Sequence, residues 1–224
     1  MLPALAHVDD WIFDLDNCLY PAATNLFALI DVRMGEYIQR LLACDAAEAR
    51  IVQKRHFLEH GTTLAGLMRT HHVDPHDFLD FVHDIDLARI AADPALVAAL
   101  DRLPGRKFVF TNASEGYAAR VLERLGLANA IDGMHDIHAM NYAPKPDPAS
   151  YRALCDRFAI APARAVFVED MARNLIPAKA LGMTTVWVDN GSEKGGHDAD
   201  RAAIDFVTHD VGAWLGEIVE EEMA

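Results

Sequence analysis

Short, continuous apolar runs alternate with helix-like periodic segments along most of the chain. Apolar runs of about four to eight residues are typical of strands buried on both faces of a sheet. Such runs lie at residues 8–15, 107–111, 165–168 and 184–188, with weaker ones at 134–139 and 205–207. Helical patterns lie between them, at residues 94–103, 114–125, 148–158 and 172–181. This alternation predicts an α/β fold in which helices cover both faces of a parallel sheet.

One long segment, residues 22–93, breaks the alternation because it offers helical patterns and no strand candidate. Its periodic apolar positions include Leu26, Ile30, Met34, Tyr37, Ile38 and Leu41. A segment inserted directly after the first strand leaves the sheet at its carboxyl edge, where open α/β sheets bind ligands. We therefore predict a core formed by residues 1–21 and 94–224, with residues 22–93 as an α-helical cap over the ligand site.

The charge balance excludes one class of function. The 224 residues include 20 Lys and Arg against 34 Asp and Glu, which gives a formal net charge of −14. Nucleic acid binders gain affinity by neutralising phosphates with basic residues, so we expect no nucleic acid polymer as a partner. Hydrophobic residues make up 52% of the chain, which is enough for a sizeable core. The length suits one domain that carries an insertion.

The chain shows no pattern of a membrane or secreted protein. Its apolar runs are far shorter than the roughly 18 residues that span a bilayer, and residues 1–7 lack a basic region. Cys18, Cys44 and Cys155 form no CxxC pair, so we predict neither a disulfide framework nor a cysteine zinc site. We expect a cytoplasmic protein without membrane contact.

Two acids, Asp14 and Asp16, follow the first apolar run. The residues before them, Trp11, Ile12 and Phe13, are apolar and predict burial, and buried carboxylates are costly without a cation. Because an Asp-x-Asp pair is common as a plain structural feature, it gives only weak support for a catalytic site by itself.

A second polar group follows the second strand candidate. Thr111 and Asn112 end this strand, and Ser114 and Glu115 open the next helix. A hydroxyl and main-chain N–H groups would gather here, where an oxyanion can bind. The alternative is that these residues only cap the helix.

A lysine and a second acidic pair complete the set. Lys145 lies between Pro144 and Pro146 before a helix, and Glu169 and Asp170 end the third strand candidate. Each has a plain alternative, a turn or a solvated strand end. Together the groups place four carboxylates, a lysine and a hydroxyl at one sheet edge. That set is typical of magnesium-assisted phosphoryl transfer through a covalent aspartyl intermediate.

With these four groups the sequence resembles the haloacid dehalogenase (HAD) superfamily. Residues 14–20 look like its first motif, residues 110–112 its second, Lys145 its third and residues 168–170 its fourth. The motifs follow one another in the right order and the resemblance covers nearly the whole chain. It implies a Rossmann-like parallel core with an inserted cap, and Mg²⁺ as cofactor.

The resemblance implies roles in phosphoryl transfer. Asp14 is expected to attack phosphorus, and Asp16 to protonate the leaving alcohol and then to activate water. Thr111 and Lys145 are expected to hold the phosphoryl oxygens, and Asn112 to add a main-chain or side-chain donor. If Asp16 acts as an acid, its pKa must be raised by its acidic neighbours.

The resemblance also implies a metal site. The carboxylates of Asp14 and Asp170 and the main-chain carbonyl of Asp16 are the expected Mg²⁺ ligands. Glu169 is expected to bind the ion directly or through water. Asn174 is expected on the helix after the fourth motif, where it orients Lys145 or a metal-bound water.

Within the superfamily, residues 57–67 and 82–86 look like the cap of the pyrimidine 5′-nucleotidase branch, as does the sequence of residues 19–21. Two positions depart from the usual pattern. Cys18 stands where Thr or Val is usual, and Glu169 stands where many relatives have Asp. Neither change removes a required functional group.

Specificity is expected to lie in the cap. Residues 61–63 are predicted to end one helix and begin the next, either presenting N–H groups and hydroxyls to a substrate or forming only a turn. His60, Thr62 and Thr63 are the leading candidates. The full set of candidates is Tyr20, Arg33, Tyr37, His56, His60, Thr62 and Thr63.

Several other sequence features are interpreted as structural rather than catalytic. The cap histidines lack the spacing of metal ligands and are predicted to be exposed: His71, His72, His76 and His83. Residues 191–196 are predicted to be a flexible loop rather than a phosphate-binding loop, and residues 220–222 a solvated helix end. Cys18 is interpreted as a packing residue.

The sequence thus predicts a magnesium-dependent HAD phosphatase acting on a small phosphorylated metabolite, with a pyrimidine 5′-nucleotide as the first candidate. A sugar phosphomutase and a non-catalytic HAD-like phosphate-binding protein are the alternatives. A haloacid dehalogenase is less favoured because it needs neither magnesium nor an acid at position 16. The protein is expected to be a monomer or a homodimer.

Overall fold

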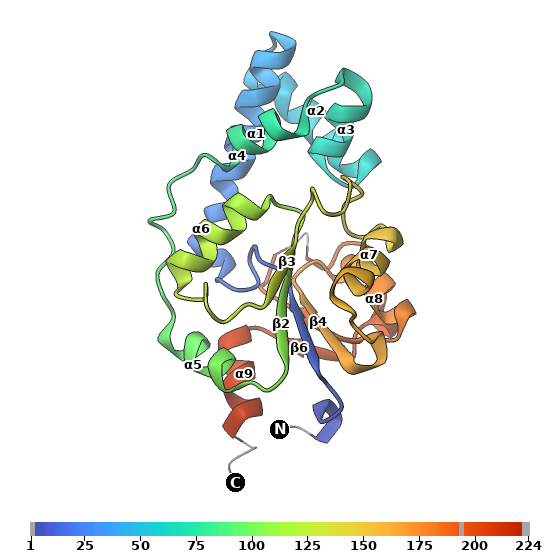
Figure 1. Ribbon diagram of the computed structural model, residues 1–224. Helices are drawn as coiled ribbons and strands as arrows, with labels where there is room; N and C mark the ends of the chain where they lie inside the picture. The colour runs from blue at the N-terminus through green and yellow to red at the C-terminus, as the bar shows by residue number, and fades with distance from the viewer. Residues whose placement is uncertain (1–2, 193–194, 221–224) are drawn as a thin grey trace.

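The side chains of the first strand, β1 (Asp10–Phe13), divide between two apolar layers, one on each face of a sheet. Trp11 and Phe13 point into one layer and Ile12 into the other, as the two-residue period of a strand requires. In the computed structural model, which describes residues 3–192 and 195–220, β1 lies in the middle of a six-stranded sheet (Figure 1).

All paired strands of this sheet are parallel, in the order β3-β2-β1-β4-β5-β6. The strands after β1 are β2 (Arg106–Phe110), β3 (Gly133–His135), β4 (Ala165–Glu169), β5 (Thr184–Val188) and β6 (Phe206–Thr208). Because β2 and β4 flank β1, the carboxyl ends of the first, second and fourth strands are neighbours. The sequence placed functional groups at these three ends.

Helices cover both faces of the sheet, which confirms the predicted α/β fold (Figure 1). The layer containing Trp11 is covered by α5 (Pro94–Arg102), α6 (Glu115–Leu125) and α9 (Val211–Glu220). The rings of Trp11 and Trp214 meet edge to face there, with centroids 6.2 Å apart. The layer containing Ile12 is covered by α7 (Pro148–Phe158) and α8 (Leu175–Leu181).

The segment between β1 and α5 contains four helices and, within the described residues, no strand. These helices are α1 (Leu26–Leu42), α2 (Ala46–His60), α3 (Thr63–His71) and α4 (Pro75–His83). Figure 1 shows them above the carboxyl ends of the strands. This is the position expected for a segment that leaves the sheet directly after β1.

Local signals in the sequence explain the helix boundaries in this segment. The Asp45 carboxylate accepts from the N–H groups of Ala47 and Glu48, and the Glu48 side chain accepts from Asp45 N, which forms a capping box at the start of α2. Gly61 ends α2 with φ of 81°, a conformation that glycine adopts without strain. Thr62 then begins α3 by accepting from Ala65 N.

Three predicted elements differ from the structure. The strand predicted at residues 8–15 is shorter in the structure and is assigned only over β1, because the chain turns at residues 16–19, where Asn17 adopts φ of 59°. Of residues 134–139 only the beginning pairs, in β3, and the rest forms turns. The helix predicted at residues 172–181 begins as a 3₁₀ turn, Ala172–Asn174, before α8.

Four further 3₁₀ turns connect the elements, at Pro3–Leu5, Ala22–Thr24, Pro162–Arg164 and Arg201–Ala203. In the predicted loop 191–196, Glu193 and Lys194 lie outside the described residues, as do Glu221 and Glu222 of the predicted helix end. Across the part of the chain that the structure describes, no helix is both long and apolar enough to cross a bilayer.

Candidate active site

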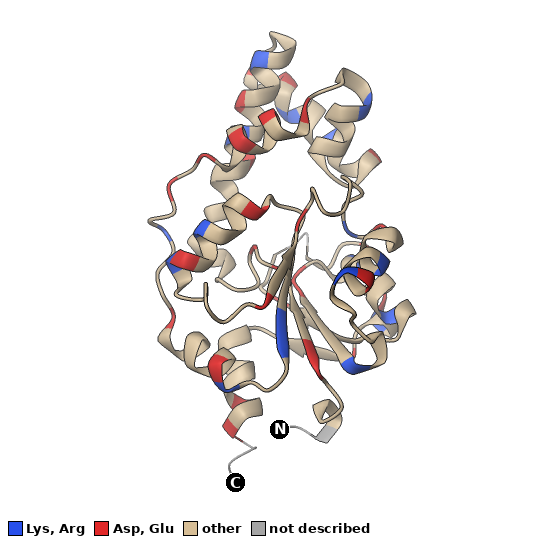
Figure 2. Cartoon of the chain, viewed as in Figure 1, with Lys and Arg blue, Asp and Glu red and all other residues tan. Residues whose placement is uncertain are grey.

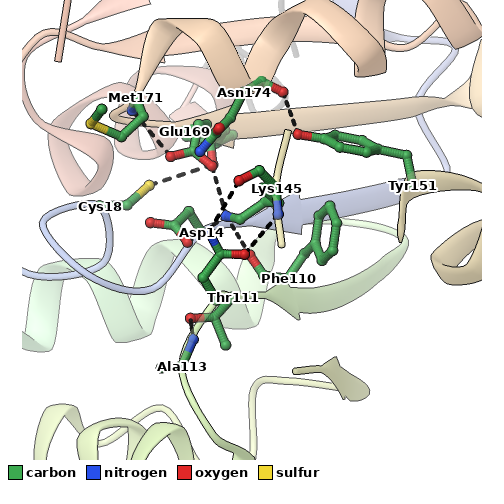
Figure 3. Close-up of polar contacts among 12 residues, drawn as sticks. Asp14, Cys18, Phe110, Thr111, Ala113, Lys145, Tyr151, Glu169, Met171 and Asn174 are labelled. Carbon is green, nitrogen blue, oxygen red and sulfur yellow. Dashed lines mark hydrogen bonds and ion pairs between the residues drawn. The ribbon is translucent and has the colours of Figure 1, made fainter. Parts of the chain in front are cut away.

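The functional groups predicted from four motifs meet at the carboxyl edge of the sheet (Figure 3). Asp14 follows β1 and extends its pairing by one residue, since Asp14 N donates to Val168 O at 2.9 Å. Glu169 ends β4 and Asp170 follows it. Lys145 comes from the loop after β3 and reaches the same place.

The Lys145 ammonium is the centre of this group. Its Nζ donates to Asp14 Oδ1 at 2.6 Å, to Glu169 Oε2 at 2.7 Å and to Phe110 O at 2.8 Å. An ammonium has three donors, so all are used. Lys145 is only 2% exposed. Burial disfavours the charged form of Lys145, but the carboxylates of Asp14 and Glu169 outweigh this effect and raise its pKa. Lys145 is therefore protonated and positively charged at neutral pH.

Three buried acids surround this cation. Asp14, Glu169 and Asp170 each offer a carboxylate oxygen, and these oxygens lie within 4.8 Å of one another. Burial, with the nearby Glu169 charge, raises the pKa of Asp14 to about 7 in spite of Lys145. Burial and the same neighbour raise the pKa of Asp170 well above its usual value. One ammonium therefore does not neutralise the group, and a second cation would stabilise it.

The residues fit a hydrated Mg²⁺ ion. Carboxylate oxygens are the ligands this hard cation prefers, and it usually keeps several waters. The Asn174 side chain points toward Glu169 (Figure 3), and its buried Oδ1 has no hydrogen-bond partner in the described chain. A metal-bound water would satisfy this atom. Among the described residues, no hydrogen bond joins the Asn174 side chain to Lys145. The predicted role of Asn174 in orienting Lys145 therefore has no contact to support it.

Glu169 already has a donor on each oxygen. Oε2 accepts from Lys145, and Oε1 accepts from Met171 N at 3.1 Å. Asp170 is less constrained. Its Oδ2 accepts from Asn190 Nδ2 at 3.2 Å. Of the two predicted ways for Glu169 to approach a metal ion, contact through water therefore needs less rearrangement.

Asp16 lies apart from the acidic group and is held by two tyrosines. The hydroxyls of Tyr20 and Tyr117 donate to Asp16 Oδ1 at 2.5 Å and 2.8 Å. Burial raises the pKa of Asp16, while the two phenol hydrogen bonds act in the opposite direction. Sequence reasoning placed Tyr20 among the substrate contacts and missed Tyr117, which lies on α6 without a distinguishing motif.

Thr111 and Asn112 shape the loop after β2. Thr111 is buried, and its Oγ1 accepts from Ala113 N at 3.0 Å. The Asn112 side chain bonds to the main chain of Lys145 through both of its polar atoms. Of the two donors predicted for Asn112, the side chain is therefore already used, and the main-chain N–H is the one left for a phosphate oxygen.

Three of the predicted cap contacts pack or pair with other residues of the helical segment. The Arg33 guanidinium pairs with Glu36 at 3.0 Å and lies 3.9 Å from the centroid of Phe81. Tyr37 packs edge to face on Phe81, with ring centroids 5.6 Å apart. His56 is 1% exposed. Amphipathic periodicity does not separate a substrate-facing position from an interior one.

The predicted helix turn at residues 61–63 does meet the core. Arg173, three residues after Asp170, donates through Nη2 to Gly61 O at 3.4 Å, and its guanidinium lies 4.8 Å from the centroid of Phe57. No sequence signal identified this arginine. The Thr62 hydroxyl is used to cap α3, and Thr63 is buried.

The remaining leading candidate of the cap, His60, is half-buried, and its Nε2 lies 3.9 Å from Glu59 Oε2. His60 therefore keeps a partly accessible ring at the end of α2. Among the three leading candidates, its side chain has the fewest structural contacts, since Thr62 caps α3 and Thr63 is buried.

The prediction that the cap histidines are exposed is wrong for His83, which is 6% exposed. Its ring stacks on Tyr117 with centroids 4.4 Å apart, and its Nδ1 lies 2.9 Å from Ser114 Oγ. Burial, with the nearby Arg120 charge, lowers the pKa of His83 to about 3. Ser114 therefore bonds a histidine rather than capping α6, where Asp136 accepts from Glu115 N instead.

Cys18 is buried, and its Sγ donates to Val168 O at 3.5 Å. Burial and the surrounding carboxylates raise the pKa of Cys18 well above its usual value, so the thiol stays protonated. This agrees with a packing residue.

A family model described as haloacid dehalogenase-like hydrolase matches residues 11–182. The chain belongs to this family of hydrolases. Among curated proteins, Phosphate metabolism protein 8 of Saccharomyces cerevisiae is 26% identical over 191 residues, covering 77% of this chain and 59% of that protein. Phosphoglycolate phosphatase of Rhodospirillum rubrum is 35% identical over 137 residues, covering 58% of this chain and 55% of that protein.

The chain thus spans a little over half the length of these two relatives. Among solved structures, a HAD phosphatase from Thermococcus onnurineus superposes with a TM-score of 0.64 at 20% identity, covering 95% of this chain and 98% of that one. At that identity the likeness shows the fold, which is the parallel core described above.

Proposed function

We propose that the protein is a magnesium-dependent phosphomonoester hydrolase that forms an aspartyl-phosphate on Asp14. The observation that carries the proposal is the buried Lys145 ammonium, bonded to both Asp14 and Glu169 inside a group of three carboxylates. A lysine alone would neutralise one acid. An excess of acids beside it is what a site for a divalent ion and a phosphate requires.

The side chains divide the reaction between them. Asp14 attacks phosphorus while Asp16 gives a proton to the leaving alcohol oxygen, and the P–O bond to that oxygen breaks. Asp16 then takes a proton from a water whose oxygen attacks phosphorus, which frees Asp14 and inorganic phosphate. The Thr111 hydroxyl holds a phosphoryl oxygen during both steps, and Lys145 holds another by exchanging one of its present acceptors for it.

Asp14, Asp170 and the main-chain carbonyl of Asp16 would hold Mg²⁺, with Glu169 reaching it through water. When bound, the ion supplies positive charge to the phosphoryl oxygens. The protein's own field does not attract an anionic substrate, since its net charge is −14 and acidic residues are spread over α1, α4, α6 and the 84–93 linker (Figure 2). Local cations must therefore bind the phosphate.

For the substrate we propose a small phosphorylated metabolite, with a pyrimidine 5′-nucleotide as first candidate. Residues 22–93 would form the cap that selects it, with His60 and the turn at residues 61–63 closest to the core edge. The contact of Arg173 with Gly61 supports this placement. The name of the Rhodospirillum rubrum relative makes 2-phosphoglycolate the natural competitor in a substrate screen.

The test measures phosphate release from UMP, AMP and 2-phosphoglycolate, with Mg²⁺ and with EDTA. We expect release that requires Mg²⁺ and that is faster for UMP than for AMP. Asp14→Asn is expected to abolish release while its circular dichroism spectrum and unfolding midpoint stay close to those of the wild type. Full activity in this variant refutes the nucleophile, and equal turnover of UMP and AMP refutes only the pyrimidine assignment.

A further inference from the structure

The carboxylate of Asp16 is bonded at one oxygen by two phenols from separate parts of the chain. Tyr20 belongs to the loop after β1, and Tyr117 to α6, about a hundred residues later. Both donate to Oδ1, at 2.5 Å and 2.8 Å. A phenol is protonated at neutral pH and carries a single proton, so each tyrosine gives its one donor to the same atom.

This arrangement makes the two oxygens of Asp16 unequal. A carboxylate oxygen offers two lone-pair sites, and the tyrosines fill both sites of Oδ1. A proton carried by Asp16 therefore sits on Oδ2. Among residues 3–192 and 195–220, no hydrogen bond reaches Oδ2 in the structure.

Asp16 is more exposed than the two tyrosines that bond it. Tyr20 and Tyr117 are 2% and 1% exposed, whereas Asp16 is half-buried. Because both phenols donate to Oδ1, a ligand that bonds the Asp16 carboxylate meets Oδ2. The tyrosines thus occupy Oδ1 and leave Oδ2 without a hydrogen bond among the described residues.

Tyr117 is itself held in place from the helical segment. The His83 ring at the end of α4 stacks on it at 4.4 Å with an interplanar angle of 15°. His83 is fixed in turn by Ser114 Oγ at 2.9 Å and by Arg120, which donates to its main-chain carbonyl. The phenol that bonds Asp16 therefore has little freedom to rotate away.

We propose that Tyr20 and Tyr117 are positioning residues that hold Asp16 with Oδ2 toward the leaving-group oxygen. This inference rests on the proposed phosphatase function. In the first step the proton leaves Asp16 Oδ2 for the leaving oxygen as that oxygen separates from phosphorus. In the second step Oδ2 takes a proton from the attacking water. The tyrosines keep their own protons throughout.

The test compares two kinds of leaving group in Tyr20→Phe, Tyr117→Phe and the double variant. A p-nitrophenolate departs from phosphorus without a proton, whereas the alkoxide of a nucleotide or alkyl phosphate needs one. Leaving-group release is measured in the first turnover, so that the later hydrolysis of the aspartyl-phosphate does not contribute. In the tyrosine variants, we expect the release rate of the alcohol from an alkyl phosphate to fall by about tenfold or more relative to the release rate of p-nitrophenolate. KM is expected to stay nearly unchanged.

Two controls separate positioning from stability. Tyr151→Phe removes another buried phenol, whose hydroxyl donates to Asn174 O at 2.6 Å, and is expected to lower the unfolding midpoint without changing the alkyl-to-aryl ratio. In an Asp16→Asn background, Tyr117→Phe is expected to cause no further change in the ratio, because the group it positions is already lost.

The outcomes distinguish the inference from the function on which it rests. If the wild type releases phosphate from no substrate, the proposed function fails and the inference fails with it. If the wild type is active and the alkyl-to-aryl ratio is the same in both tyrosine variants, only the inference is overturned. An equal change of this ratio in Tyr151→Phe also overturns it, since the effect would then reflect general loosening.

Discussion

The side chain of Asn112 makes a reciprocal pair of hydrogen bonds with the main chain of Lys145. Asn112 Oδ1 accepts from Lys145 N at 2.8 Å, and Asn112 Nδ2 donates to Lys145 O at 3.3 Å. The loop after β2 thereby fixes the loop that delivers the ammonium to Asp14. The second HAD-like motif holds the third in place, in addition to any contact it makes with phosphate.

Asn112→Ala is therefore expected to lower kcat by about tenfold to a hundredfold, because a displacement of about 1 Å at a reacting group has effects of this size. The measurement is steady-state phosphate release at saturating Mg²⁺. Asn129→Ala, at an exposed loop position, is the control and is expected to leave kcat unchanged. Equal kcat in the two variants would show that Lys145 needs no support from Asn112.

Mg²⁺ is expected to stabilise the folded protein, because only the folded chain holds oxygens of Asp14, Glu169 and Asp170 within 4.8 Å of one another. At a free concentration about 100 times Kd, the free energy of unfolding should rise by about 2.7 kcal/mol. The measurement is urea unfolding with Mg²⁺ and with EDTA, which does not depend on turnover.

Asp170→Asn is expected to lose most of this Mg²⁺-dependent increase. Asp156→Asn removes the same charge at an exposed position on α7 and should keep the increase in full. A similar response to Mg²⁺ in both variants would place the ion elsewhere on this acidic protein.

The sheet and most helices could be predicted because each strand is a short apolar run and each helix has its own period. The acidic group could be predicted as well, since Asp14, Glu169 and Asp170 follow strands whose carboxyl ends meet at one edge. These inferences need only local pattern and the general geometry of parallel sheets. Distances between the groups played no part in them.

The remaining features depend on contacts between distant segments. Tyr117 lies on an ordinary amphipathic helix, and nothing near it in sequence shows that its hydroxyl reaches Asp16. Arg173 and His83 likewise have roles set by the packing of α2 and α4 against the core. Ser114 has the residue type and position of a helix cap, but the neighbouring His83 takes its hydroxyl and Asp136 caps the helix.

Gly66 lies where α3 packs closely on α2, and Gly116 on α6 serves as its control. A Cβ on Gly66 would lie 2.4 Å from Cβ of His56, which is the rigid base of a buried side chain. Gly66→Ala is expected to destabilise the protein by about 1–3 kcal/mol through overpacking. A Cβ on Gly116, in α6, meets nothing within 4 Å, and Gly116→Ala should stabilise by about 0.5–1 kcal/mol. Urea unfolding of the two variants should move in opposite directions; a shift of the same sign in both would contradict the close contact.

The buried His83 is expected to make stability depend on pH. Its pKa is about 3 in the fold against 6.5 as an ordinary value, because burial and the Arg120 charge disfavour the imidazolium. Below pH 6.5 the unfolded chain binds a proton that the folded chain does not, so stability falls as the pH decreases toward 3. At about 1.4 kcal/mol for each pH unit, this histidine should cost about 2 kcal/mol between pH 6.5 and pH 5.

His83→Phe keeps a ring against Tyr117 and removes the titration, although it also loses the bond to Ser114. The variant should be less stable than the wild type at pH 8, and this deficit should shrink by about 2 kcal/mol at pH 5. His72→Asn is the control, since His72 is exposed and has φ of 54°, a conformation that asparagine accepts. Because the difference between two pH values is measured, the lost hydrogen bond cancels and only the proton uptake remains. If the free energies of unfolding of the wild type and His83→Phe change equally with pH, His83 binds its proton equally in the folded and unfolded chain. The buried stack of His83 on Tyr117 would then lack the rigidity assigned to it.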